Sequence, residues 1–355
     1  MYRIAEIIEN DGASTMVNEV SFHPSGSYFA ATCENINEVR VYDSRTRKLL
    51  QVLKNPDSQL DRPHGVLFTQ KYLLVTNKHD QKKPGTINVY RNDVTITKPI
   101  QIFQTPFNHL HELHTLAMRG GRLVTTYCEN LAPTGAVVSY GFNEGKITGP
   151  LDKTESWFSD YGDSKGICFN ADGTKILVTF QSAKQNIFIN KLRKKIGMKG
   201  LSFGKSLRRV DSNKSVELET PSAQDIIPIK KPTKNGIAIF AITEEGKIAR
   251  SPDQIIVQKN FCRLENIDIF HNTCVITDVV NRSFVLFDLT QDPKFKKPIQ
   301  TVNFGNAAPH GAKFSPDGRL LVISCLGLKI VNQKIQWGDW ESPREDKVLI
   351  FEHAI

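Results

Sequence analysis

The feature that most constrains this chain is a short pattern that recurs along it. RPHGVLF at residues 62–68 returns as APHGAKF at residues 308–314. Seven segments share the pattern of a polar residue, a short apolar run and a turn, and they begin near residues 17, 63, 113, 164, 223, 264 and 309. A repeat of roughly 40–50 residues is typical of propeller blades, each built from four strands.

Each repeat continues with further strand-like runs. A second run follows the turn, as in SYFAATCEN, YLLVTNKH and KILVTFQS, and a third comes next, as in EVRVYD, NIFINK and KVLIFE. These runs are rich in Val, Ile, Phe and Tyr and are separated by Gly, Pro, Asn and Asp, which is typical of strands and turns. In the fifth repeat, GIAIFAIT stands as the second run and KIARS is a poor match to the third.

The two ends of the chain complete each other. The last repeat has three runs before Ile355, whereas YRIAEII precedes the first repeat and has no blade of its own. Pairing this N-terminal strand with the last blade closes the ring and removes exposed sheet edges. We therefore predict an all-β fold, with residues 1–355 forming one seven-bladed β-propeller domain.

Two insertions interrupt the predicted blades. Residues 191–214 lie between the expected third and fourth strands of blade four, on the lower face, and residues 325–347 lie between the second and third strands of blade seven. The net charge of the chain is +9, and residues 191–214 hold nine lysine and arginine residues against one aspartate. Positive charge is therefore concentrated in one segment.

The basic segment has several explanations. Lys194, Lys195, Arg208 and Arg209 could bind an acidic surface, on a protein or an anionic membrane, but a solvated loop has the same composition. Aromatic residues that stack on bases are nearly absent from the segment, so we expect no sequence-specific nucleic-acid binding.

Composition and motifs exclude several classes of protein. No apolar stretch has the ~20 residues needed to span a bilayer, and the N-terminus lacks the apolar region of a secretory signal. The six cysteines are scattered, so we expect a cytoplasmic protein with reduced thiols and no transmembrane segment. Walker, dinucleotide-binding and nucleophile-elbow motifs are missing, which argues against kinases, NTPases, dehydrogenases and serine hydrolases.

One polar residue of each repeat aligns at the channel mouth. The first strands of a propeller line its channel, and their starts share one face, here called the upper face, with the ends of the second strands. The aligned residues are Asn18, His64, His114, Lys165, Gln224, Glu265 and His310. Asp278, Trp337 and Trp340 are expected on the same face. Polar groups that converge on a concave opening are typical of a ligand site, although a water-filled channel also favours polar residues.

Three of the aligned residues are histidines, which we expect on one side of the ring. Glycine follows His64, Lys165 and His310, which allows close approach of a neighbouring backbone. Imidazoles with nearby carboxylates could hold a divalent ion, but the spacing matches no compact zinc signature. We therefore assign no metal ligands and expect no cofactor, with a metal-dependent lyase or hydrolase as an alternative. A perturbed pKa in the ring would favour a functional site.

General acid–base catalysis requires two groups with different pKa values. The repeated CEN places Glu34 and Glu129 at second-strand ends, opposite His64 and His310. These four residues are the candidate catalytic residues. Propeller symmetry, with each CEN paired to a neighbouring loop, also explains the repeat.

HGAKFSPDGRLLVIS and VSFHPSGSYFAATCEN, each with a strand like VRVYD, resemble the lactonase-like seven-bladed propellers. This family includes bacterial cytosolic six-phosphogluconolactonases and fungal muconate cycloisomerases. The resemblance implies an upper-face pocket that binds a small polar or anionic ligand, such as a sugar lactone, and hydrolyses it. His64, His114, Lys165 and His310 would hold the anion or carbonyl, and Glu34 or Glu129 would orient water.

The alternative is a non-catalytic interaction propeller that docks a protein partner. The Gly-His and Trp-Asp signatures of WD repeats are missing from the chain. Enzymes and scaffolds share this fold, so the fold alone assigns no function.

Overall fold

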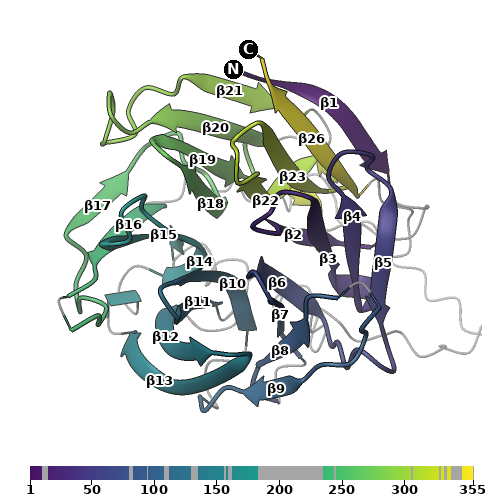
Figure 1. Ribbon diagram of the computed structural model, residues 1–355. Helices are drawn as coiled ribbons and strands as arrows, with labels where there is room; N and C mark the ends of the chain where they lie inside the picture. Colours follow the sequence, from purple (N-terminus) through teal and green to yellow (C-terminus); the bar gives the residue numbers. More distant parts are fainter. Residues whose placement is uncertain are drawn as a thin grey trace, which may run out of the picture.

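The computed structural model consists of six four-stranded antiparallel sheets arranged around a central channel (Figure 1). It describes the chain except for residues 10–14, 80–82, 94, 108–111, 129–134, 156, 159–161, 183–234, 244, 305–306, 328, 332–333, 337–345 and 355. An all-β propeller is therefore confirmed. In the described part of the chain, no helix is long and apolar enough to cross a membrane.

The first three blades follow the chain from the channel outward. Blade one contains β2 (Val17–Phe22), β3 (Tyr28–Cys33), β4 (Glu38–Asp43) and β5 (Leu49–Lys54). Blade two contains β6 (Pro63–Phe68), β7 (Tyr72–Asn77), β8 (Thr86–Arg91) and β9 (Gln101–Gln104). Blade three contains β10 (Glu112–Arg119), β11 (Arg122–Cys128), β12 (Ala136–Asn143) and β13 (Lys146–Thr154).

The other three blades complete the ring. Blade four contains β14 (Gly162–Phe169), β15 (Lys175–Ser182), β16 (Gly236–Ala241) and β17 (Gln254–Val257). Blade five contains β18 (Leu264–Phe270), β19 (Thr273–Asp278), β20 (Ser283–Asp288) and β21 (Gln300–Asn303). Blade six contains β22 (Ala308–Phe314), β23 (Leu320–Leu326), β26 (Lys347–His353) and β1 (Tyr2–Glu9).

The predicted count of seven blades is wrong. GIAIFAIT, expected as the second strand of a fifth blade, forms β16, the third strand of blade four, and KIARS forms no strand. The expected first strand near residue 223 and the NIFINK run lie outside the described residues. Because β14 packs directly against β18, and each other first strand packs against the next, six blades close the ring.

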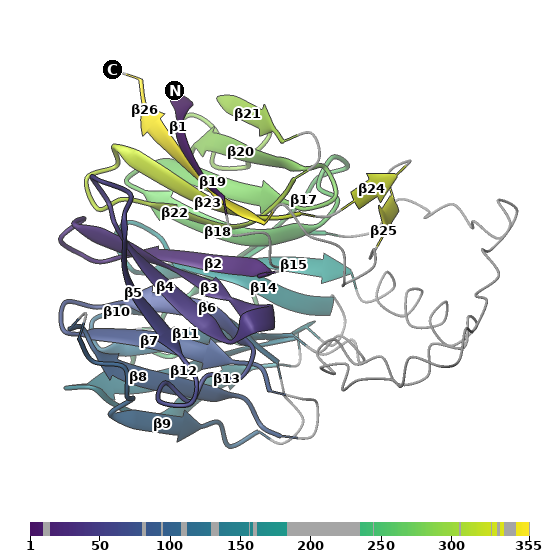
Figure 2. The same ribbon diagram turned by 90° about the vertical axis from the view of Figure 1, so that its right-hand side faces the viewer.

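The basic insertion, residues 191–214, lies outside the described residues. It was expected between a third and a fourth strand, but the strands before and after it, β15 and β16, are the second and third strands of blade four. The second insertion connects β23 to β26 as predicted, and it contains the short paired strands β24 (Lys329–Val331) and β25 (Lys334–Gln336). These two strands project from one face of the disc (Figure 2).

The N-terminal strand completes the last blade, as predicted. β1 pairs antiparallel with β26 along its length, from Tyr2 opposite His353 to Glu9 opposite Lys347. This pairing joins the two ends of the chain into one sheet. It therefore removes the open edge that would otherwise separate blade six from its fourth strand.

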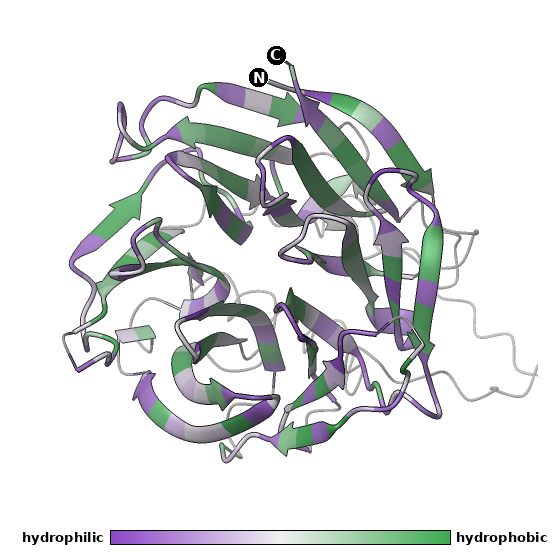
Figure 3. Cartoon of the chain, viewed as in Figure 1, coloured by the Kyte–Doolittle hydropathy of each residue, from purple (hydrophilic) through white to green (hydrophobic). Residues whose placement is uncertain are grey.

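Hydrophobic clusters lie between adjacent blades. One cluster joins Leu74 and Val89 of blade two to Leu116 and Tyr140 of blade three, and equivalent clusters occupy the other blade junctions. Hydrophobic residues dominate the strands, and hydrophilic residues dominate the connecting turns (Figure 3). Burial of these apolar faces holds the blades against one another.

A belt of hydroxyl groups joins each blade to the next near the channel. One Thr or Ser of each second strand accepts a hydrogen bond from a backbone N–H of its own first strand; these residues are Thr32, Thr76, Thr126, Thr179, Thr277 and Ser324. All but Thr179 also donate to a first-strand carbonyl of the next blade, for example Thr277 to His310 at 2.6 Å. Each such hydroxyl therefore connects two blades.

We expect Thr277→Val to destabilise the protein by about 1–3 kcal/mol, because it leaves the buried N–H of Asn266 and the carbonyl of His310 without this partner. Chemical denaturation measures the free energy of unfolding. Thr301→Val, on exposed strand β21, is the matched control and should change it by less than about 0.5 kcal/mol. Equal unfolding of Thr277→Val and the wild type would show that the belt does not stabilise the ring.

Candidate functional site

A β-bulge in each first strand places one side chain at the channel mouth. The pairing of first and second strands shifts at the same point in all six blades. The first residue of each bulge is Asn18, His64, His114, Lys165, Glu265 or His310, and none is more than 6% exposed. Gln224, the seventh aligned residue, lies outside the described residues.

The second residues of the bulges form a layer next to this ring. They alternate between Glu19, Thr115 and Asn266 and the glycines Gly65, Gly166 and Gly311. The amide of Asn266 donates to both carboxylate oxygens of Glu19, at 2.9 and 2.7 Å, and the Thr115 hydroxyl donates to Glu19 at 3.2 Å. Burial raises the pKa of Glu19 to about 8, against the effect of these bonds.

The three glycines allow the blades to approach closely, as predicted. A Cβ on Gly166 would lie 2.6 Å from the Cα of Asn266, and a Cβ on Gly311 would lie 2.6 Å from the carbonyl oxygen of Asn18. At Gly65 the obstacle would be the carbonyl oxygen of His114. Glycine is therefore required where the backbone of the next blade meets the bulge.

The three histidines meet across the channel. One ring nitrogen of each of His64, His114 and His310 lies within 4.8 Å of the others. The ring centroids of His64 and His114 are 4.0 Å apart, and that of His310 lies 5.2 and 5.7 Å from them. They were expected on one side of the ring, but with six blades His114 and His310 come from opposite blades, three and six.

Hydrogen bonds orient all three imidazoles. His64 Nδ1 lies 3.2 Å from the carbonyl oxygen of His114, and His310 Nδ1 lies 3.0 Å from that of Asn18. A carbonyl oxygen can only accept, so both Nδ1 atoms carry the proton. His114 Nδ1 lies 3.1 Å from the Thr115 hydroxyl, which can donate to it or accept from it.

All three rings are neutral at physiological pH. Burial lowers the pKa of His64 and His114 well below the ordinary value and that of His310 to about 4, and the nearby charge of Lys165 acts in the same direction. With Nδ1 protonated, the Nε2 atoms of His64 and His310 present a lone pair. His64 Nε2 is buried and has no hydrogen-bond partner among the described residues.

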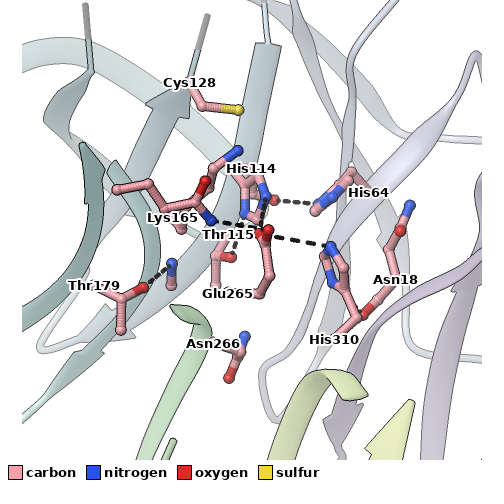
Figure 4. Close-up of polar contacts among 12 residues, drawn as sticks. Asn18, His64, His114, Thr115, Cys128, Lys165, Thr179, Glu265, Asn266 and His310 are labelled. Atoms are coloured by element: carbon pink, nitrogen blue, oxygen red, sulfur yellow. Dashed lines mark hydrogen bonds and ion pairs between the residues drawn. The ribbon is translucent and has the colours of Figure 1, made fainter. Parts of the chain in front are cut away.

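Glu265 adds a carboxylate to the cluster (Figure 4). Its Oε1 accepts hydrogen bonds from Gln181 at 2.9 Å and from Arg263 at 2.7 Å. Its Oε2 lies 3.5 Å from His114 Nε2 and 3.7 Å from His310 Nε2, and it makes no hydrogen bond within the described part of the chain. Burial would raise the pKa of Glu265, but Lys165 and Arg263 hold it well below its ordinary value.

Glu34, a candidate catalytic residue, is engaged in a buried ion network. It begins the short 3-10 helix η1 (Glu34–Ile36) and accepts hydrogen bonds from Asn18, Arg62 and Lys78. Burial would raise its pKa, but the charges of Lys78 and Arg62 lower it to about 2. Because both oxygens are occupied, Glu34 ties blade one to the loop before blade two rather than facing a ligand.

Other predicted site residues fall into two groups. The oxygens of Asp278 accept backbone N–H bonds from residues 262, 263 and 281, so this side chain holds a loop in place. The second group lies outside the described residues and comprises Glu129, Gln224, Trp337, Trp340, Lys194, Lys195, Arg208 and Arg209.

Sequence reasoning missed the charged residues that surround the ring. Four charged residues each stand two positions before a ring residue in the sequence: Arg62, Glu112, Asp163 and Arg263. Each of them interacts electrostatically with a buried charged residue at the channel mouth. The same alignment that identified the ring would have revealed this second set. This second set brings carboxylates and cations close together at the channel mouth.

Comparisons with known proteins identify the fold alone. No protein-family model and no curated protein matches the chain. Among solved structures, a luciferin-regenerating enzyme has a TM-score of 0.61 at 10% identity, covering 98% of this chain and 96% of that one. Hydrazine synthase of Kuenenia stuttgartiensis has a TM-score of 0.54 at 12% identity, with full coverage of both chains. A chain of a mitotic checkpoint complex has a TM-score of 0.52 at 9% identity, covering 100% and 94%.

We expect Glu19→Gln to remove a pH-dependent loss of stability. The pKa of Glu19 is about 8 in the folded protein and near 4.3 in an unfolded chain, so the folded state holds a proton that the unfolded state releases. The wild type should therefore lose about 1 kcal/mol per pH unit relative to the variant between pH 5 and 7. Denaturation at several pH values measures this difference.

Glu6→Gln makes the same change on the exposed side of β1 and is the control. Parallel stability curves for Glu19→Gln and the wild type across this range would contradict a protonated Glu19.

Proposed function

We propose that the channel mouth binds a divalent transition-metal ion through His64, His114 and His310, with Glu265 as a fourth ligand, and that the protein is a metal-dependent hydrolase of small polar or anionic molecules. The observation that carries the proposal is the convergence of four electron-pair donors. A carboxylate oxygen of Glu265 lies 3.5 and 3.7 Å from the Nε2 atoms of His114 and His310, and a ring nitrogen of His64 lies within 4.8 Å of those of the other two histidines.

Such a set of atoms requires a cation. Lone pairs that face one another at short range repel, and burial removes the water that would screen them. An anion cannot relieve this repulsion at His64 and His310, because these neutral imidazoles have their only N–H group engaged at Nδ1. Imidazole and carboxylate together favour zinc, iron, manganese or cobalt over calcium.

The spacing fits one ion. Two ligand atoms that each lie about 2.1 Å from a metal are at most about 4.2 Å apart. The separations of Glu265 Oε2 from His114 Nε2 and His310 Nε2, 3.5 and 3.7 Å, meet this limit. The ring nitrogens lie within 4.8 Å of one another, so small side-chain rotations bring them into range.

The surrounding contacts are those that metal ligands require. A metal-bound histidine normally donates its other N–H to a carbonyl or carboxylate, which fixes the ring and its tautomer. His64 and His310 donate to backbone carbonyls, and Nδ1 of His114 shares a hydrogen bond with the Thr115 hydroxyl. Gln181 and Arg263 orient Glu265 in the same way.

A metal at this position supports hydrolysis of an ester or lactone. A metal held by these residues would lower the pKa of a bound water and so supply a nucleophile for the carbonyl carbon. The bond from that carbon to the ring oxygen of a lactone would break, and the leaving oxygen would take up the proton that the water gives up, which yields a hydroxy acid. The resemblance of the repeats to lactonase-like propellers supports this substrate class.

No two of the six cysteines form a disulfide with each other, which supports a reducing, cytoplasmic location.

We expect the protein to bind one equivalent of Zn²⁺, Mn²⁺, Fe²⁺ or Co²⁺ and each of His64→Ala, His114→Ala and His310→Ala to weaken binding by more than about 100-fold. Removing a metal ligand should lower the metal affinity more than removing a residue that only orients a ligand. Mass spectrometry of the metal content and competition with a chelator measure the stoichiometry and the affinity.

His271→Asn, at an exposed turn between β18 and β19, is the matched control and should retain the metal. Circular dichroism establishes that each variant is folded. A folded wild type that binds none of the four ions at micromolar concentration would overturn the proposal.

A further inference from the structure

Lys165 is the one cation of the bulge ring. It is the first residue of the bulge in blade four, between His114 of blade three and Glu265 of blade five, and it is 3% exposed. Burial disfavours its charge, but the neighbouring acidic groups, among them Glu265 and Asp163, raise its pKa above the ordinary value. Lys165 is therefore charged at neutral pH.

The ammonium group of Lys165 has no partner among the residues that the structure describes. The other described cations at the mouth are paired: Arg62 and Lys78 with Glu34, and Arg263 with Glu265. Lys165 makes neither an ion pair nor a side-chain hydrogen bond with another described residue. The charges of Glu265 and Asp163 stabilise the ammonium group, but its three hydrogen-bond donors have no acceptor among the described residues, which leaves them available to an added group.

Lys165 does not serve the metal. Its charge lowers the pKa of all three histidines, and it repels a divalent cation bound to them. A positive charge beside a metal ion can instead bind an anion that contacts both the metal and the ammonium group. The ammonium group offers three donors, and it holds carboxylate or phosphate oxygens as a point charge.

We propose that Lys165 binds the anionic group of the substrate, so that an oxyanion of the carboxylate or phosphate type is held between this ammonium group and the metal. The inference rests on the proposed function and assigns its substrate class: small molecules that carry an oxyanion near the reacting carbonyl. The hydroxy-acid product of lactone hydrolysis is itself such an anion.

This arrangement predicts opposite effects of one substitution. Lys165→Met keeps the length of the side chain and removes its charge. Metal affinity should stay the same or rise, because a repelling charge is lost, whereas oxyanion affinity should fall by at least about tenfold. General damage to the channel would instead weaken both.

The experiment uses the full chain loaded with Co²⁺. Its visible spectrum is titrated with gluconate in one arm and with inorganic phosphate in the other, and calorimetry repeats both titrations on the metal-free protein. Gluconate binding that depends on Lys165 identifies a carboxylate substrate, and phosphate binding that depends on it identifies a phosphorylated one. Lys165→Arg should keep most of the affinity for the anion that binds.

Lys175→Met is the matched control. Lys175 begins β15 in the same blade, at the end of the sheet far from Lys165, and pairs with Asp253. Removing its charge should change neither the metal affinity nor the anion affinity.

The two proposals fail in different ways. If the wild type binds no Co²⁺ but binds gluconate or phosphate through Lys165, the metal proposal is wrong and the anion site stands. If Co²⁺ binds and Lys165→Met binds both anions as tightly as the wild type, Lys165 is not the anion site. Parallel loss of Co²⁺ and anion binding in Lys165→Met would assign it a structural role and overturn the inference.

Discussion

The hydroxyl belt is the interaction on which the rest of the structure depends. Five of its hydroxyls donate to the backbone carbonyls of ring residues in the next blade. Two of those carbonyls, at Asn18 and His114, also accept the Nδ1–H of a histidine. The contacts that close the propeller therefore also fix the tautomers of His64 and His310, so fold and site share the same atoms.

The bulges and the glycines act together with this belt. A bulge allows two consecutive residues of a first strand to leave the ladder, so that one enters the ring and the next meets the neighbouring blade. Gly65, Gly166 and Gly311 accept that contact, whereas Glu19, Thr115 and Asn266 form a polar layer at the equivalent positions. Glycine and larger polar residues thus alternate at the second bulge position around the six blades. In this arrangement ring nitrogens of His114 and His310, from opposite blades, lie within 4.8 Å of each other.

Much of the fold could be predicted from the sequence, because strand length, turn residues and the position of the polar ring residue repeat locally. The number of blades could not, because an apolar alternating run such as GIAIFAIT suits a second or a third strand equally well. The hydroxyl residue was the missing signal: it lies in the middle of six second strands, and β16 lacks it there. The arrangement of the site depended on the blade count, since six blades place His114 and His310 on opposite blades. The pairing of Glu34 with Arg62 and Lys78 depends on loops whose contacts no local pattern specifies.

The central claim is that the converging lone pairs of His64, His114, His310 and Glu265 hold a metal ion. X-ray absorption spectroscopy of protein loaded with one equivalent of Zn²⁺ tests it most directly, because the spectrum reports the atoms bound to the ion. The account predicts three imidazole nitrogens at about 2.0–2.1 Å and oxygen in the remaining positions. A first shell without imidazole, or one with sulfur from the cysteines, would contradict it.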